Sequence, residues 1–264
     1  MKPRRPSLDF SGACARWIPS APGFAHQLNA ASSALPYLEP YLIRVLKLAR
    51  EKLDPAAHAE LIRDVDLFNQ QEANHFRLHA RYNAALRAQY PGLEPFEEQI
   101  RRDYEGFLRE RSLAWNLAYC EGFECTGLVS AELFFGPAQE FLRDADPAVR
   151  DLWSWHLAEE HEHRSVCHDV LRALHPGWLR RLGGYWHFLR HLQAHGNRVA
   201  RHLHAVDRER GLHGEASRAA DARFRRAARR FTLPRTLAIL SPRYDPAPRR
   251  PTPAIAQALA RYEG

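Results

Sequence analysis

The 264-residue sequence has few of the features that mark cross-linked, zinc-ribbon or membrane-spanning proteins. It contains only 4 cysteines, and no two of them form a Cys-x-x-Cys pair, which argues against a thiolate zinc site and a disulfide framework. No apolar run reaches the roughly 18 residues that a membrane span needs. The basic N-terminus, residues 1–6, is not followed by the apolar stretch of a secretory signal. We therefore expect a cytoplasmic protein without a transmembrane segment.

Lysine is also scarce, because the sequence has three lysines against 35 arginines and a formal net charge of +7. We interpret this bias as the result of a genome that favours arginine rather than as a sign of nucleic-acid binding. We therefore expect no nucleic-acid partner. Within residues 216–230, arginines alternate with apolar residues. A solvated helix face is the favoured interpretation of this stretch, and binding to an anionic partner such as a membrane surface or nucleic acid is the alternative.

The sequence predicts an all-α fold. Alternating strand patterns are scarce, no Asn-Gly or Asp-Gly hairpin signal occurs, and hydrophobic residues make up 45% of the chain. Prolines separate the predicted helices. The first helix is expected to end at about residue 53, with Pro36 and Pro40 in its opening turns. Further helices are expected over 54–90, 93–135, 146–175, 177–213 and 216–230, and the one over 93–135 should break near residue 110.

We divide the chain into three parts on this basis. Residues 1–27 form an N-terminal segment, residues 28–175 a four-helix metal-binding bundle of the ferritin-like type, and residues 176–264 an Arg-rich extension with additional C-terminal helices. The 264 residues suit one large domain or two small ones.

Two Glu-x-x-His steps carry most of the functional information. They are Glu72–His75 and Glu160–His163, and each lies in a stretch with helical character. Residues three or four apart share a helix face, so each step presents a carboxylate and an imidazole together. A four-helix bundle builds a two-metal site from two such steps and one further carboxylate from each of the other two helices.

The two further carboxylates are expected in the helix before each step. Glu39 lies among leucines, where an unpaired carboxylate would be costly to bury. Glu124 also has apolar neighbours, and Glu121, one turn earlier, remains an alternative. Glu39 precedes Glu72 by 33 residues and Glu124 precedes Glu160 by 36. This near-equal spacing favours two antiparallel helix pairs.

His156 adds a third imidazole, because it precedes Glu160 by four residues and His163 by seven and so shares their helix face. His79 is a further candidate, as a ligand, a proton carrier or an outer partner of a ligand. Glu159 and Glu162 are interpreted as solvated or supporting residues. Mixed carboxylate and imidazole donors favour two iron or manganese ions, with zinc as another option. The predicted metal ligands are Glu39, Glu72, His75, Glu124, His156, Glu160 and His163, with Glu121 and His79 as further candidates.

These motifs resemble those of a bacterial family known as predicted metal-dependent hydrolases. The segment from Trp155 to Arg164 is similar to the signature of that family, Gln71 to Asn83 is similar to its second-helix motif, and Leu35 to Glu39 to its first. The segment from Asn29 to Ser32 precedes the first motif as in the family. Around Glu124 the match is weaker, because Thr126 stands one position early. The resemblance covers about residues 17–175. The ligand spacing is also similar to that of the di-iron N-oxygenases, which oxidise aryl amines.

The spacing of the three donors His156, Glu160 and His163 leads to a first hypothesis of a di-iron enzyme that activates O2 to oxidise an organic substrate. Such an enzyme would have O2 and a small molecule as partners, with an electron donor and a homodimer left open. The second hypothesis is a dinuclear metal-dependent hydrolase that uses the same ligands. The third is a non-catalytic iron-binding helical protein.

Overall fold

The computed structural model describes residues 1–212 and 214–263, and all regular secondary structure in these residues is helical. The all-α prediction is therefore confirmed. The helices are α1 (Pro22–Arg50), α2 (Ala59–Gln89), α3 (Glu94–Glu110), α4 (Leu113–Phe134), the short 3-10 helix η1 (Pro137–Phe141), α5 (Pro147–Glu162), α6 (Val166–Leu174), α7 (Trp178–Glu209), α8 (Glu215–Ile239) and α9 (Pro253–Arg261). In the described part of the chain, no helix has both the length and the apolar character needed to cross a membrane.

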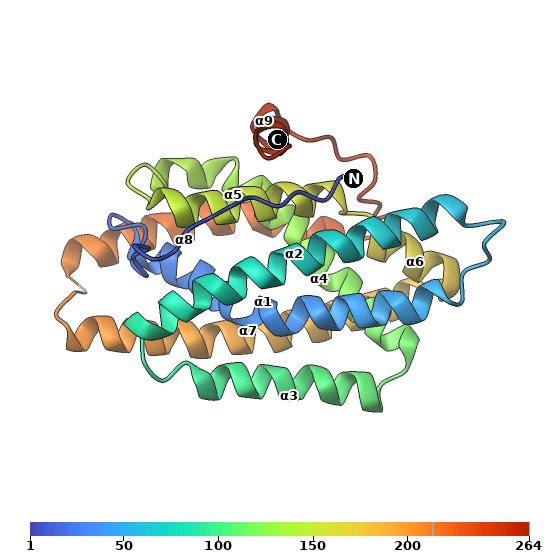
Figure 1. Ribbon diagram of the computed structural model, residues 1–264, viewed down its shortest axis with the longest axis horizontal. Helices are drawn as coiled ribbons and strands as arrows, with labels where there is room; N and C mark the ends of the chain where they lie inside the picture. The colour runs from blue at the N-terminus through green and yellow to red at the C-terminus, as the bar shows by residue number, and fades with distance from the viewer. Residues whose placement is uncertain (213, 264) are drawn as a thin grey trace.

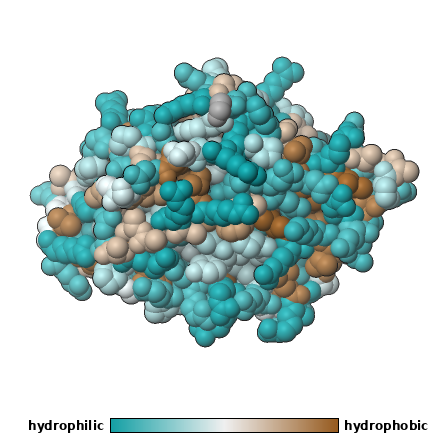
Figure 2. All heavy atoms as spheres, in the orientation of Figure 1, coloured by the Kyte–Doolittle hydropathy of each residue, from teal (hydrophilic) through white to brown (hydrophobic). Residues whose placement is uncertain are grey.

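The helices form an elongated molecule in which α1 and α4 are central (Figure 1). Helix α1 packs against α2, α3, α4 and α7, and α4 packs against α5, α6, α7 and α8. Helix α3 lies along one side, and α9 lies on the opposite side next to the N-terminal segment. The apolar residues of these helices form one large buried cluster. Hydrophobic residues occupy only scattered areas on the face shown in Figure 2, which is mostly hydrophilic.

Several helix boundaries agree with the sequence prediction. The second helix begins at Ala59, five residues after its predicted start, and three further differences concern other helices. The predicted break near residue 110 is confirmed, since α3 ends at Glu110 and α4 begins at Leu113. The predicted helix over 146–175 is interrupted between Glu162 and Val166, so that His163 caps α5. The predicted helix over 216–230 is longer and continues through Pro234 to Ile239. Its five arginines over 223–230 are exposed, as expected for a solvated face.

The third difference concerns the two prolines of the first helix. Helix α1 begins at Pro22, so Pro36 and Pro40 lie inside it and not in its opening turns. A proline has no N–H to donate to the carbonyl four residues earlier, and at Pro36 this leaves the carbonyl of Ser32 open. The side-chain amide of Asn83 on α2 donates to that carbonyl at 2.7 Å. A partner from another helix thus replaces the missing helical hydrogen bond.

The division of the chain into three parts and the ferritin-like character of the bundle stay predictions. Helix α1 itself begins inside the predicted N-terminal segment of residues 1–27.

Candidate metal centre

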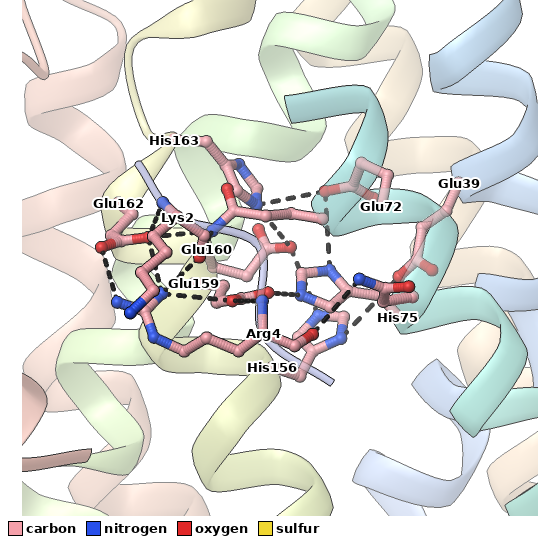
Figure 3. Close-up of polar contacts among 12 residues, drawn as sticks. Lys2, Arg4, Glu39, Glu72, His75, His156, Glu159, Glu160, Glu162 and His163 are labelled. Atoms are coloured by element: carbon pink, nitrogen blue, oxygen red, sulfur yellow. Dashed lines mark hydrogen bonds and ion pairs between the residues drawn. The ribbon is translucent and has the colours of Figure 1, made fainter. Parts of the chain in front are cut away.

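Four helices bring the seven predicted ligands into the interior of the protein. Glu39 comes from α1, Glu72 and His75 from α2, Glu124 from α4, and His156, Glu160 and His163 from α5 and its C-cap. Each of these residues is buried, with at most 2% of its surface exposed. Figure 3 shows six of them, all except Glu124, pointing toward a common centre.

The donor atoms at this centre lie close together. The Nε2 atom of His163 is 3.1 Å from Oε1 of Glu72 and 3.8 Å from Oε1 of Glu160. The Nδ1 atom of His75 is 3.6 Å from the same oxygen of Glu72. These four residues each offer a donor atom within 4.8 Å of the others. A second group, formed by Glu39, His75 and His156, meets the same criterion, so His75 belongs to both groups.

Many of these buried atoms have no hydrogen-bond partner in the protein. Both carboxylate oxygens of Glu39, Glu72 and Glu160 are unpaired, as are Nδ1 of His75 and Nε2 of His163. A buried carboxylate without a partner is strongly unfavourable, and proteins relieve this by protonation, by ion pairing or by a bound metal. The unpaired atoms converge, and carboxylate oxygens with imidazole nitrogens are suitable donors for iron, manganese or zinc. The residues therefore fit a metal centre.

The pKa values of the carboxylates and imidazoles indicate which of them carry a proton in the metal-free cluster. Burial, followed by repulsion from Glu72 and Glu160, raises the pKa of Glu39 well above its usual range. Burial and the Glu160 charge raise the pKa of Glu124 to about 8. For His75, burial opposes the charged ring, but the hydrogen bond with Glu159 and the nearby Glu72 carboxylate outweigh it and raise the pKa to about 9. Protons thus occupy part of this site when no cation does.

Glu159 orients His75, and Arg4 in turn holds Glu159. Oε2 of Glu159 accepts a hydrogen bond from Nε2 of His75 at 3.0 Å, so that Nδ1 of the ring is left to face Glu72. Oε1 of Glu159 accepts from the backbone N–H of Arg4 at 3.0 Å and from its guanidinium at 3.2 Å. Figure 3 shows the N-terminal segment crossing the site at this point. The sequence offered no signal for Arg4, because it lies 155 residues from Glu159.

A chain of hydrogen bonds determines the state of His156. Asn83 donates its amide to the carbonyl that Pro36 leaves open, so its Oδ1 accepts from the Ser32 hydroxyl at 2.6 Å. The Ser32 oxygen accepts from Nδ1 of His79 at 2.8 Å, and Nε2 of His79 accepts from Nδ1 of His156 at 3.1 Å. The Nε2 lone pair of His156 is then free, 3.3 Å from Oε1 of Glu160. His79 is thus a hydrogen-bond partner of His156, which agrees with the outer-partner role among the three that the sequence left open.

The two alternative carboxylates of α4, Glu121 and Glu124, have different partners in the structure. Oε2 of Glu124 accepts from Nδ1 of His163 at 2.9 Å. Glu121 is also buried, but its Oε1 accepts from Nδ1 of His168 at 2.9 Å and lies 3.5 Å from the Arg181 guanidinium. Residues three apart on a helix differ in direction by about 60°, and here that angle directs the two side chains to different partners. Glu124 lies in the cluster and Glu121 does not.

Gly127 is a further residue whose role the sequence did not indicate. A Cβ atom at this position would overlap the carboxylate of Glu160. The glycine therefore lets Glu160 approach the backbone of α4, which a larger residue would prevent.

The comparison with protein families agrees with this donor set. Residues 2–249 match the model of a family described as predicted metal-dependent hydrolase. The match is longer than the 17–175 range over which the sequence motifs resemble that family, and it includes α7 and α8. No curated protein and no solved structure gives a significant match. A match over nearly the whole length shows that the chain belongs to the family of predicted metal-dependent hydrolases.

Proposed function

We propose that this protein is a metal-dependent enzyme that binds two metal ions through Glu39, Glu72, His75, Glu124, His156, Glu160 and His163. One observation carries the proposal, namely the convergence of buried oxygen and nitrogen atoms that have no partner in the protein. In a bundle, one carboxylate from each of two helices and a Glu-x-x-His step from each of two others hold about two metal ions.

The family description favours hydrolysis as the reaction. A bound metal pair supplies a nucleophile by lowering the pKa of a water molecule and neutralises charge that develops on the substrate. The protein's own groups prepare the donors. Glu159 keeps the proton of His75 on Nε2, and His79 keeps the proton of His156 on Nδ1. Both rings thereby present a lone pair to the centre, and the surrounding apolar side chains exclude bulk water.

Activation of O2 by two iron ions is the second candidate reaction. The observation that favours it is the burial of all seven predicted ligands, since at most 2% of any of them is exposed. A small gas reaches such a centre more easily than a bulky ester does. The third imidazole, His156, also agrees with the ligand order of the N-oxygenases. Both candidate reactions require a small-molecule substrate, whereas only the second requires O2 and an electron donor. A cytoplasmic location and a homodimer stay predictions.

Metal loading followed by two assays separates the candidates. Metal-free protein is loaded with Zn(II), with Mn(II) or, without air, with Fe(II), and the bound metal is counted. We expect about two ions per chain. Hydrolysis of an uncharged ester panel by the zinc or manganese form, abolished by a chelator, supports the hydrolase. A transient visible chromophore on mixing the iron form with O2 supports the oxygenase. Less than one ion per chain with every metal would contradict the proposal.

A further inference from the structure

A cavity of about 470 Å³ lies where the bundle meets the C-terminal helices. Its walls come from α1, α4, α5, α7 and α8, helices that pack together in Figure 1. The volume is within the usual range for small-molecule sites. Helices α7 and α8 provide nearly half of its lining, and both lie within the residues that match the family.

The cavity and the metal centre use neighbouring residues of the same three helices. On α5, Leu157 lines the cavity and directly follows His156. On α4, Thr126 lines it and precedes Gly127, whose backbone contacts Glu160. On α1, Ala31 lines it and lies two helical turns before Glu39, which corresponds to about 12 Å along the axis.

The lining of this cavity is unlike the rest of the molecule in charge. Charged residues make up 26% of the chain, yet every residue that lines the cavity is uncharged. Four other cavities in the described residues each include at least one arginine. The uncharged lining combines apolar side chains such as Phe24 and Leu189 with neutral polar ones such as Gln193 and Thr232.

We propose that this cavity binds the substrate of the metal centre and that the substrate is an uncharged, largely apolar small molecule. An ionised ligand would lose its hydration without finding an opposite charge on the walls, which is strongly unfavourable. A neutral hydroxyl or carbonyl group finds hydroxyl and amide partners there. The substrate role rests on the metal-dependent function proposed above, whereas the selectivity of the cavity follows from its lining alone.

The cavity is tested first on metal-free protein with the neutral dye Nile red, followed by fluorescence. We expect saturable binding, and displacement by 1-decanol at a concentration at least about tenfold lower than by decanoate, because the two chains match in length and differ in charge. Ala228→Trp on α8 fills the cavity and should weaken dye binding about tenfold or more. The matched control is Ala219→Trp, an exposed position on the same helix, which should bind the dye normally.

Metal stoichiometry and thermal unfolding of both variants check that they fold. If Ala228→Trp unfolds, Ala31→Leu on α1 replaces it as a milder filling of the same cavity. Unchanged dye binding in a folded cavity variant, or equal displacement by decanol and decanoate, would overturn the proposal.

The link to the metal centre has its own measurement. In Mn(II)-loaded protein we expect faster relaxation of the 1-decanol proton signals by NMR, and no such effect in Ala228→Trp. Bound manganese without faster relaxation would overturn the substrate role. Failure to bind any metal, with selective decanol binding intact, would instead contradict the proposed metal-dependent function, so the two failures are distinguishable.

Discussion

Two clusters of buried charged groups differ in how completely they are paired. The first is centred on Asp207 of α7, which is fully buried. Its Oδ1 accepts from the Tyr90 hydroxyl at 2.6 Å, and its Oδ2 accepts from Nε2 of His26 at 2.9 Å and from the Arg16 guanidinium. Burial opposes the charged form, but the hydrogen bonds from His26 and Tyr90 outweigh it and lower the pKa of Asp207.

The second cluster is the candidate metal centre, where three carboxylates have no hydrogen bond to either oxygen. A buried carboxylate with donors at both oxygens joins parts of the fold, and Asp207 joins α7 to α1, α2 and the N-terminal segment. Carboxylates that face one another without hydrogen-bond donors are held by protonation or by nearby imidazolium rings when no metal is bound, and their oxygens are open to a metal ion. The difference teaches that hydrogen-bond pairing, rather than burial alone, distinguishes the candidate metal centre from the buried charge cluster that joins helices.

The largest effect is expected for Glu160→Ala. Glu160 lies between His156 and His163 and approaches both at 3.3 and 3.8 Å, so its loss should abolish metal binding, as counted by elemental analysis. Unfolding of the metal-free variant should be no easier than in the parent, because an unpaired carboxylate is removed. Glu121→Gln serves as the matched control, since it changes a buried carboxylate of α4 outside the cluster. Retained metal in Glu160→Ala would refute the ligand assignment.

Asp207→Ala should show the opposite behaviour. The change leaves His26 and Arg16 without their partner, and breaking a buried ion pair costs about 3 kcal/mol or more in the free energy of unfolding. Urea denaturation measures this, while the metal content should stay the same. Asp151→Ala, which removes the pair with the exposed guanidinium of Arg261, should cost less than about 1 kcal/mol. Loss of metal in Asp207→Ala would show that the two clusters are coupled.

His79→Ala tests whether an outer partner behaves differently from a ligand. The variant removes the acceptor that holds the proton of His156 on Nδ1. Metal affinity at one site should fall about 10–100-fold, with the full stoichiometry reached at higher metal concentration. Isothermal titration calorimetry gives both quantities. A reduced stoichiometry at saturating metal would identify His79 as a ligand.

The last prediction concerns the pH dependence of metal affinity. Glu124, with a pKa of about 8, and His75, with a pKa of about 9, hold protons in the metal-free cluster at neutral pH. Metal binding displaces these protons, so affinity should rise with pH across the neutral range, by up to about tenfold per pH unit for each proton released. Titration calorimetry in buffers of different ionisation enthalpy counts the protons. An affinity that stays constant from pH 6.5 to 8.5 would show that no proton is displaced.

Much of the candidate site could be predicted from the sequence, because its signals are local. Helical periodicity determines that Glu72 and His75 share a face, and the same holds for His156, Glu160 and His163. The structure brings the donor atoms of six predicted ligands together and places the seventh, Glu124, against His163, and their assignment as ligands stays a prediction. The helical class and the break near residue 110 are likewise consequences of local composition and of helix-ending signals.

The sequence by itself determined the helical class of the protein and which donors lie on one helix face. Only the tertiary structure decided that Glu124 and not Glu121 enters the cluster, that Asn83 completes the hydrogen bonding at Pro36, and that Arg4 holds Glu159. It also decided that α7 and α8 enclose an uncharged cavity beside α4. The reason is physical: periodicity describes neighbours within one helix, whereas these contacts join residues that are 39 to 155 positions apart and meet only when the helices pack.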